Sequence, residues 1–265
     1  MSLDIMTPRL TASPFTRANP LSKLAAVAMV TVVVMLSVDW VSAGVVLAAE
    51  LLLMPVLGIS AWALFKRGWP LVVAALVGAY GTALLAEKTG AVVFEAGPLL
   101  FTEDSINSGV AIGLRSLAVA LPGIFLLLTT DPTDLADALA QKLKLPHRFV
   151  LGALAGLRLV GLLVDEWRTL GLARRARGVG AENKPLAKLA AFLGQAFGLI
   201  VQAIRRATRL AVAMEARGFG GAQRTWARES TFSRVDIWVF LGGALVSAAA
   251  VTAAVSAGTW NFIFG

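Results

Sequence analysis

The sequence of 265 residues contains no cysteine and only one histidine. The lack of cysteine excludes disulfide bridges, thiolate metal sites and cysteine nucleophiles. A single histidine, His147, leaves little room for a zinc site or a histidine-based triad. The chain also lacks a G-x-x-x-x-G-K-[S/T] phosphate loop, which excludes ATP hydrolysis by that route. A membrane enzyme is therefore the least favoured class, and we predict a non-catalytic protein that binds no metal or cofactor of its own.

Charge is also scarce, because charged residues make up 15% of the chain and hydrophobic residues 57%. An average globular chain has about 25% charged and about 45–50% apolar residues. A transmembrane helix needs about 17–25 apolar residues, and the sequence offers five such stretches. They lie near residues 22–39, 41–65, 69–87, 108–130 and 235–258. The predicted fold class is an all-α polytopic membrane protein, embedded in the lipid bilayer.

The basic residues gather between the fourth and fifth predicted spans. Residues 131–234 hold 17 Lys and Arg against 8 Asp and Glu, a net charge of +9, whereas the rest of the chain carries −1. This pattern predicts three parts: residues 1–130 with four spans, residues 131–234 as an extramembrane domain, and residues 235–265 with the last span. The positive-inside rule places the N-terminus and the basic domain in the cytosol and the C-terminus outside.

Charges in the shorter loops agree with this orientation. Lys66 and Arg67 are predicted to lie in a cytosolic loop between the second and third spans. The loop between the third and fourth spans is acidic, with a net charge of −3, and is predicted to lie outside.

Helix signals divide the basic domain into three helices. The first follows the cap Asp131 and runs to about residue 143, the second runs over 147–177, and the third over 186–217. In the third helix a polar residue recurs every seven positions, which predicts a long amphipathic helix at the membrane interface. Aromatic residues are sparse in this domain, so nucleic-acid binding is disfavoured.

A six-residue pattern, A-x-x-A-R-G, closes both long helices of this domain. The first copy contains Ala173, Ala176, Arg177 and Gly178, and the second contains Ala213, Ala216, Arg217 and Gly218. A single Arg-Gly pair is explained by helix capping, because the glycine adopts a left-handed conformation and the cation complements the helix dipole. The repeated alanines go beyond capping. They make each helix end slim enough to enter a groove, where an arginine fork suits a carboxylate.

These motifs resemble the T component of energy-coupling factor (ECF) vitamin transporters, the EcfT and CbiQ/BioN-like membrane scaffolds. The resemblance covers most of the chain. It is strongest at residues 209–219, 172–178, 129–139 and 145–148, and it includes Asn19-Pro-Leu-Ser-Lys23 before the first span.

The resemblance implies a set of partners. Arg177 and Arg217 would each dock in a groove of one of two ABC ATPase subunits, which would bind the ATP and Mg²⁺. The extra basic residues of the first motif, Arg174 and Arg175, are compatible with two different ATPases. A membrane-embedded S component would bind the vitamin or micronutrient and contact the rest of the coupling domain. The implied function is to couple ATP hydrolysis to movement of the S component in a bacterial or archaeal cell membrane.

Two charged residues, Glu50 and Arg115, lie inside predicted spans. An intramembrane charge is a candidate functional residue. The simpler interpretation is a structural pair, or a residue that lies at the membrane interface. The functional interpretation gives an alternative for the whole protein, a permease that carries its substrate through its own spans.

Overall fold

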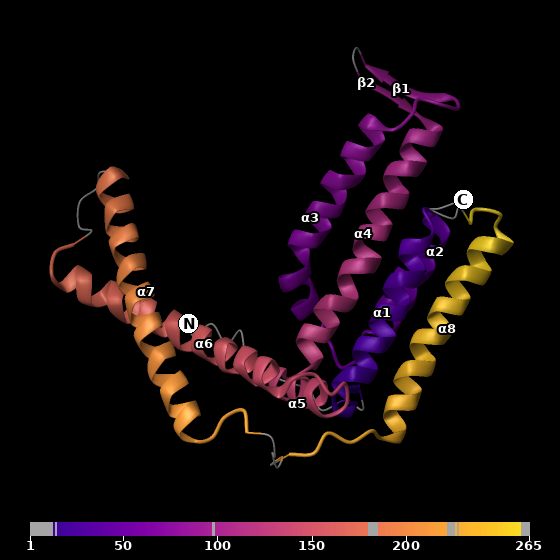
Figure 1. The fold of residues 1–265 in the computed structure, drawn as a ribbon. Coiled ribbons are helices and arrows are strands. Elements are labelled where there is room, and N and C mark those ends of the chain that lie inside the picture. Colours follow the sequence, from indigo (N-terminus) through magenta and orange to yellow (C-terminus); the bar gives the residue numbers. More distant parts are fainter. Residues whose placement is uncertain are drawn as a thin grey trace. The chain divides into compact units, whose positions relative to one another are not determined.

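The computed structural model describes residues 13, 15–96, 99–179, 185–221, 226 and 228–260 (Figure 1). Within these ranges the regular secondary structure is helical except for one short β-hairpin, which confirms the all-α fold class. The described residues form two compact units. The bundle unit comes from residues 8–135 and 231–265, and the α6–α7 unit from residues 136–230.

The helices begin and end close to their predicted positions, with one exception. They are η1 (Phe15–Arg17), α1 (Pro20–Leu36), α2 (Trp40–Leu53), α3 (Ala61–Leu85), α4 (Glu103–Thr129), α5 (Pro132–Gln141), α6 (His147–Ala176), α7 (Pro185–Ala216) and α8 (Arg234–Ser256). Polar side chains cap several N-termini by accepting a first-turn backbone N–H, as Asp39 does for α2 and Thr102 for α4.

Four described helices, α3, α4, α7 and α8, are long and apolar enough to cross a membrane. The predicted third, fourth and fifth spans correspond to α3, α4 and α8. The first two correspond to α1 and α2, which are shorter, with 17 and 14 residues. Helix α7 passes the same test of length and hydropathy, but its polar residues lie along one face. This distribution sets it apart from the other three.

The exception is the boundary between the second and third predicted spans, which is wrong. The chain breaks at residues 54–60, where Gly58 has a φ of 73° and Ser60 caps the next helix. Lys66 and Arg67 therefore lie inside α3 and not in a loop. Lysine and arginine are good helix formers, so a charged pair does not end a helix, whereas the turn residues Pro55 and Gly58 do. Both charges still lie near one end of α3, where the positive-inside rule counts them.

A β-hairpin replaces the plain loop expected between the third and fourth spans. Strand β1 (Val92–Ala96) pairs antiparallel with β2 (Leu99–Thr102) at the end of α3 and α4 (Figure 1). The ring of Phe101 lies 6.2 Å from that of Tyr80 on α3. The β-branched and aromatic residues of Val92-Val93-Phe94 favour a strand, but a signal of three residues is too short to predict one from sequence.

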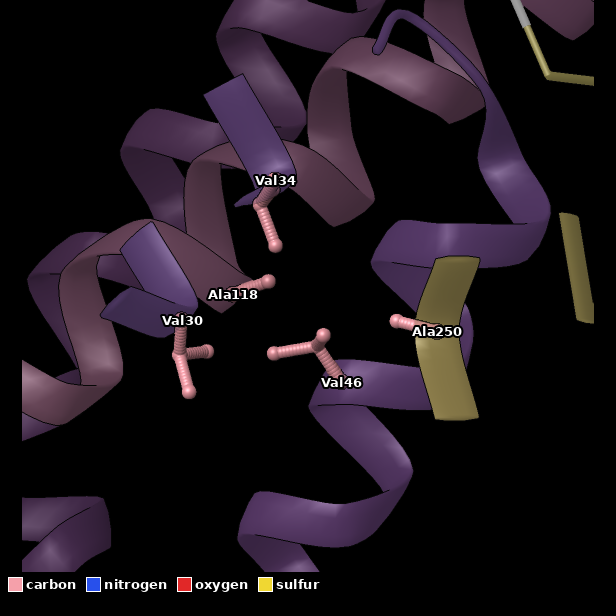
Figure 2. Packing of buried hydrophobic residues seen from close by; sticks show 5 residues of the cluster. All are labelled: Val30, Val34, Val46, Ala118 and Ala250. Atoms are coloured by element: carbon pink, nitrogen blue, oxygen red, sulfur yellow. The ribbon is translucent and has the colours of Figure 1, made fainter. Parts of the chain in front are cut away.

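Small side chains hold the bundle unit together. Figure 2 shows its central cluster, in which Val30 and Val34 of α1, Val46 of α2, Ala118 of α4 and Ala250 of α8 meet. Two glycines bring helices into close contact. A Cβ added at Gly109 on α4 would lie 2.6 Å from the Ala79 carbonyl on α3, and one at Gly243 on α8 would lie 2.9 Å from the Ala26 Cβ on α1. Such small-residue contacts are typical of membrane helices, where packing replaces the hydrophobic effect.

Buried hydrogen bonds join the helix ends at one end of the bundle unit. Asp236 on α8 accepts hydrogen bonds from the Asn19 backbone N–H at 2.5 Å and from the Ser22 hydroxyl at 2.6 Å. Lys23, which is only 1% exposed, donates to the Thr129 carbonyl at 2.8 Å at the end of α4. The Asn19-Pro-Leu-Ser-Lys23 segment therefore connects the starts of α1 and α8 with the end of α4. We call these contacts the polar joint.

The α6–α7 unit is built differently, because its two long helices cross and contact each other through polar groups (Figure 1). The Gln195 amide of α7 donates to the Trp167 carbonyl of α6 at 2.8 Å, and Arg206 of α7 forms an ion pair with Glu166 of α6. The rings of Trp167 and Phe192 add an edge-to-face contact at 5.3 Å. Most of the apolar side of α7 remains exposed.

Candidate partner-docking site

The two A-x-x-A-R-G copies fold into the same local structure. Helix α6 ends at Ala176 and α7 at Ala216, so in both copies the arginine is the C-cap residue and the glycine follows it. Gly178 and Gly218 have φ angles of 77° and 71°, in the left-handed region that favours glycine. The sequence repeat is therefore also a structural repeat.

Matching hydrogen bonds close each helix end. In the first copy the Gly178 N–H donates to the Arg175 carbonyl at 2.9 Å and the Val179 N–H to the Arg174 carbonyl at 3.0 Å. In the second copy the corresponding bonds run from Gly218 to Glu215 and from Phe219 to Met214, both at 2.9 Å. Both are Schellman motifs, which satisfy the last carbonyls of the helix. The capping interpretation therefore explains the two glycines.

Capping does not explain the two arginine side chains. Arg177 and Arg217 are exposed, and neither side chain has a hydrogen bond or ion pair with the described part of the chain. The four alanines of the motifs are exposed as well: Ala173, Ala176, Ala213 and Ala216. A Cβ at either glycine would meet nothing within 4 Å. Each helix end is thus slim and open, with one free guanidinium suited to a carboxylate partner.

The surroundings of the two helix ends differ in charge. Beside the first, a groove of about 520 Å³ lies between α6 and α7. Four cationic side chains line it, namely Arg168, Arg174, Arg175 and Lys188. The second copy has Met214 and Glu215 in place of Arg174 and Arg175, and the Gly220 carbonyl after it accepts a hydrogen bond from Arg148 of α6 at 2.8 Å. The two ends therefore offer partners a similar shape but different electrostatics.

A second candidate surface is the apolar side of α7. Its exposed residues are Leu186, Leu189, Leu193, Phe197, Ile200, Val201, Ile204 and Val212, and we call them the α7 apolar face. Phe197 is 70% exposed and Leu193 57%. Exposed apolar patches of this extent mark a surface that contacts a protein partner or a membrane.

The intramembrane charges Glu50 and Arg115 do not form a joint site. The guanidinium of Arg115 donates at 2.7 Å to the Met35 carbonyl, one of the last carbonyls of α1. A cation at this helix end complements the dipole and satisfies a free acceptor, so the structure explains Arg115 without substrate. Glu50 has no ion pair among the described residues, and both its carboxylate oxygens are buried without a hydrogen-bond partner.

Sequence reasoning missed two groups of contacts. The ion pair of Glu166 with Arg206 joins residues 40 positions apart, and no local pattern indicates it. Asp236 looks like an ordinary first-turn acidic residue, although it accepts hydrogen bonds from residues more than 200 positions away. Only its position in a capping box with Ser233 is visible in the sequence.

Comparison with known proteins covers both copies of the motif. A family model described as "Cobalt transport protein", CbiQ, matches residues 11–226. The "Energy-coupling factor transporter transmembrane protein EcfT" of Bacillus subtilis (strain 168) is 34% identical over 167 residues, which is 60% of this chain and 63% of that protein. The protein of the same name from Exiguobacterium sibiricum is 34% identical over 60% of this chain and 64% of its own length.

These two matches span slightly less than two thirds of the relatives' length. A longer match joins this chain to the protein of that name from Lacticaseibacillus paracasei (strain ATCC 334). It is 32% identical over 240 residues, covering 87% of this chain and 90% of the relative.

Proposed function

Because this chain belongs to the CbiQ family and to its EcfT transmembrane proteins, we propose that it couples partner ATPases to a membrane-embedded substrate-binding subunit. As a member it is a multi-pass membrane protein and the non-catalytic transmembrane component of an ECF-type transporter. The observation that carries the proposal is the pair of identical helix ends, each with an exposed arginine that has no partner in the described chain.

The two helix ends are the proposed contacts with two ABC ATPase subunits. Arg177 and Arg217 would each enter a groove and pair with a carboxylate, and the small Ala173, Ala176, Ala213 and Ala216 would admit the helix end. The cationic groove beside the first end and Glu215 at the second favour two non-identical ATPases. ATP and Mg²⁺ would be bound by those subunits, and the α6–α7 unit would lie in the cytosol with them.

The α7 apolar face is the proposed contact with the S component. ATP binding would draw the ATPases together and shift the two helix ends, and hence α6 and α7, against each other. Because polar groups hold the crossing of α6 and α7, the helices can transmit this shift to a partner on the apolar face. Substrate specificity would belong to that partner.

The test is replacement of Arg177 and Arg217 by alanine, singly and together, in the chain co-expressed with its ATPases and S component. Removing one partner of a buried ion pair costs about 3–5 kcal/mol, so each change should weaken ATPase binding by at least ~100-fold. Retention of the ATPases and substrate uptake should both fall, most strongly in the double variant.

The matched control is Arg205→Ala, which removes one exposed charge from the side of α7 and not from its end. We expect it to retain the ATPases and uptake. Normal uptake by the double variant of Arg177 and Arg217 would overturn the proposed docking mechanism.

A further inference from the structure

The bundle unit contains a second candidate site, a groove of about 300 Å³ bordered by α1, α2, α4 and α8. Its lining is apolar except for two charged side chains, Lys23 and Glu50. A Cβ at Gly242, on the α8 side, would meet nothing within 4 Å. Gly242 therefore keeps the groove open without bringing two helices together.

Glu50 is the unusual residue of this groove. It is only 7% exposed, and both carboxylate oxygens lack a hydrogen-bond partner within the described residues. Burying a carboxyl group without a hydrogen-bond partner is costly in either protonation state, so such a group calls for a partner from another molecule.

Lys23 does not satisfy Glu50. Its ammonium donates to the Thr129 carbonyl at 2.8 Å and to the Thr16 carbonyl at 3.3 Å, and it lies 5.1 Å from the centre of the Phe15 ring. The described residues show no ion pair between Lys23 and Glu50. Lys23 is 1% exposed, so these contacts enclose its ammonium within the polar joint. The groove thus offers one buried acceptor, the Glu50 carboxyl, that no described residue satisfies.

We infer that this groove binds one phospholipid with a primary ammonium headgroup, of the phosphatidylethanolamine type. The lipid ammonium donates to the Glu50 carboxyl group, its phosphate lies toward the open side of the groove, and an acyl chain lies against the open surface at Gly242. A primary ammonium has three N–H donors, so it can satisfy both oxygens of Glu50 that lack a partner among the described residues. A quaternary choline headgroup has no N–H to donate, so it cannot satisfy Glu50.

The position of the two charges along their helices suits a headgroup. Lys23 lies in the first turn of α1 and Glu50 in the last turn of α2, at the end of the bundle that contains the polar joint. Helix α2 has 14 residues and rises about 21 Å, which is less than the ~30 Å hydrocarbon core. The end of a helix this short allows headgroups to approach by local thinning of the bilayer.

The border of the groove suits acyl chains more than a soluble ligand. Leu53, Val56 and Trp238 line the groove and are 42%, 63% and 73% exposed. Exposed apolar side chains at the end of membrane helices contact hydrocarbon, and tryptophan is enriched at the interface with the headgroups. These contacts do not involve the A-x-x-A-R-G motifs, so the inference is independent of ATPase docking.

The test is native mass spectrometry of the full chain released from nanodiscs of phosphatidylethanolamine, phosphatidylcholine or phosphatidylglycerol with identical acyl chains. Wild type should retain one phosphatidylethanolamine, preferred over phosphatidylcholine by ~10-fold or more, the effect of a hydrogen bond to a charged group. Glu50→Gln should abolish this preference. Gly242→Leu should reduce retention of all three lipids by filling the groove.

Two controls separate the groove from general effects. Gly78→Leu adds the same side chain to an exposed part of α3 with nothing within 4 Å, and Glu103→Gln removes an exposed carboxylate from the start of α4. Both should bind lipid like wild type. Equal retention of the three lipids by wild type, or wild-type preference in Glu50→Gln, would overturn the inference.

A photoreactive residue at Val239 in the assembled complex tests whether a lipid or another protein subunit occupies the groove. Val239 lines the groove. Crosslinking to lipid is the expected result. Crosslinking to another protein subunit would show that a protein side chain satisfies Glu50 and would overturn the lipid assignment.

Discussion

In the bundle unit, small apolar side chains pack in the interior, buried polar groups join the helix ends, and large apolar side chains such as Leu85 and Leu245 face outward. In the α6–α7 unit, polar groups and one aromatic pair join the two helices, and most of the apolar side of α7 faces outward. Val46, Ala118 and Ala250 are completely buried in the first unit. In the second, Phe197 and Leu193 are more than half exposed. The first unit thus has a packed interior of its own, whereas the second has no buried apolar cluster among its described residues and leaves the apolar side of α7 for a partner.

The largest expected effect tests how far the bundle unit depends on its polar joint. Asp236→Asn removes the charge that accepts hydrogen bonds from Asn19 and Ser22. Hydrogen bonds to a charged group contribute about 1.5–3 kcal/mol each, so the loss of two should lower the free energy of unfolding by at least ~3 kcal/mol. Unfolding of the purified chain in detergent measures it. Glu87→Gln, which neutralises an exposed carboxylate after α3, should leave stability unchanged.

The next effect should appear in binding and not in folding. A double replacement of Leu193 and Phe197 by aspartate adds charge to the α7 apolar face, where neither side chain is buried in this chain. Full burial of a Leu or Phe side chain contributes about 1.5–3 kcal/mol, so retention of the S component should fall by at least ~100-fold while the chain stays folded. Co-purification measures it, with Gln202→Asp on the polar side of α7 as the control. Equal retention in both variants would show that another surface carries this contact.

The helix ends should respond locally and moderately. Gly178→Ala and Gly218→Ala each force an L residue to a φ above 70°, at a cost of about 1–2 kcal/mol. Hydrogen exchange should therefore rise in the last turn of α6 or α7 and not in the bundle unit. Gly156 lies inside α6, and a Cβ added there would meet nothing within 4 Å. Gly156→Ala should therefore lower hydrogen exchange in α6, because alanine favours the helix more than glycine does. Unchanged exchange in both cap variants would contradict the capping role.

The smallest effect concerns the polar crossing of α6 and α7. A double-mutant cycle on Glu166 and Arg206, read from hydrogen-exchange opening energies, should give a coupling below about 1 kcal/mol, since the Arg206 side chain is 41% exposed. The same cycle on Asp165 and Arg168, which are 4.0 Å apart and more exposed, should give a value near zero. A coupling of several kcal/mol for the first pair would mean that this ion pair stabilises the α6–α7 unit as strongly as the polar joint stabilises the bundle unit.

Several features of this protein are determined by local sequence. Runs of apolar residues predict α4 and α8, the heptad spacing of polar residues in α7 predicts its amphipathic character, and Arg-Gly predicts both helix ends. These predictions succeed because each depends on residues within one or two turns, where side-chain periodicity and glycine's left-handed conformation act directly. The break between α2 and α3 was misplaced because a charged pair looks like a loop, although only Pro55 and Gly58 end the helix.

Tertiary structure decided which distant groups meet. It placed Asp236 beside Asn19 and Ser22, and it gave Arg115 the Met35 carbonyl near the end of α1. It left Glu50 without a partner among the residues that the structure describes. It also turned the polar side of α7 toward α6, so that the apolar side is exposed. Such pairings depend on helix packing between residues up to 217 positions apart, for which one sequence has no local signal. The sequence by itself therefore determines the elements and the two arginine-tipped ends, and the packing determines which of their groups remain available to other molecules.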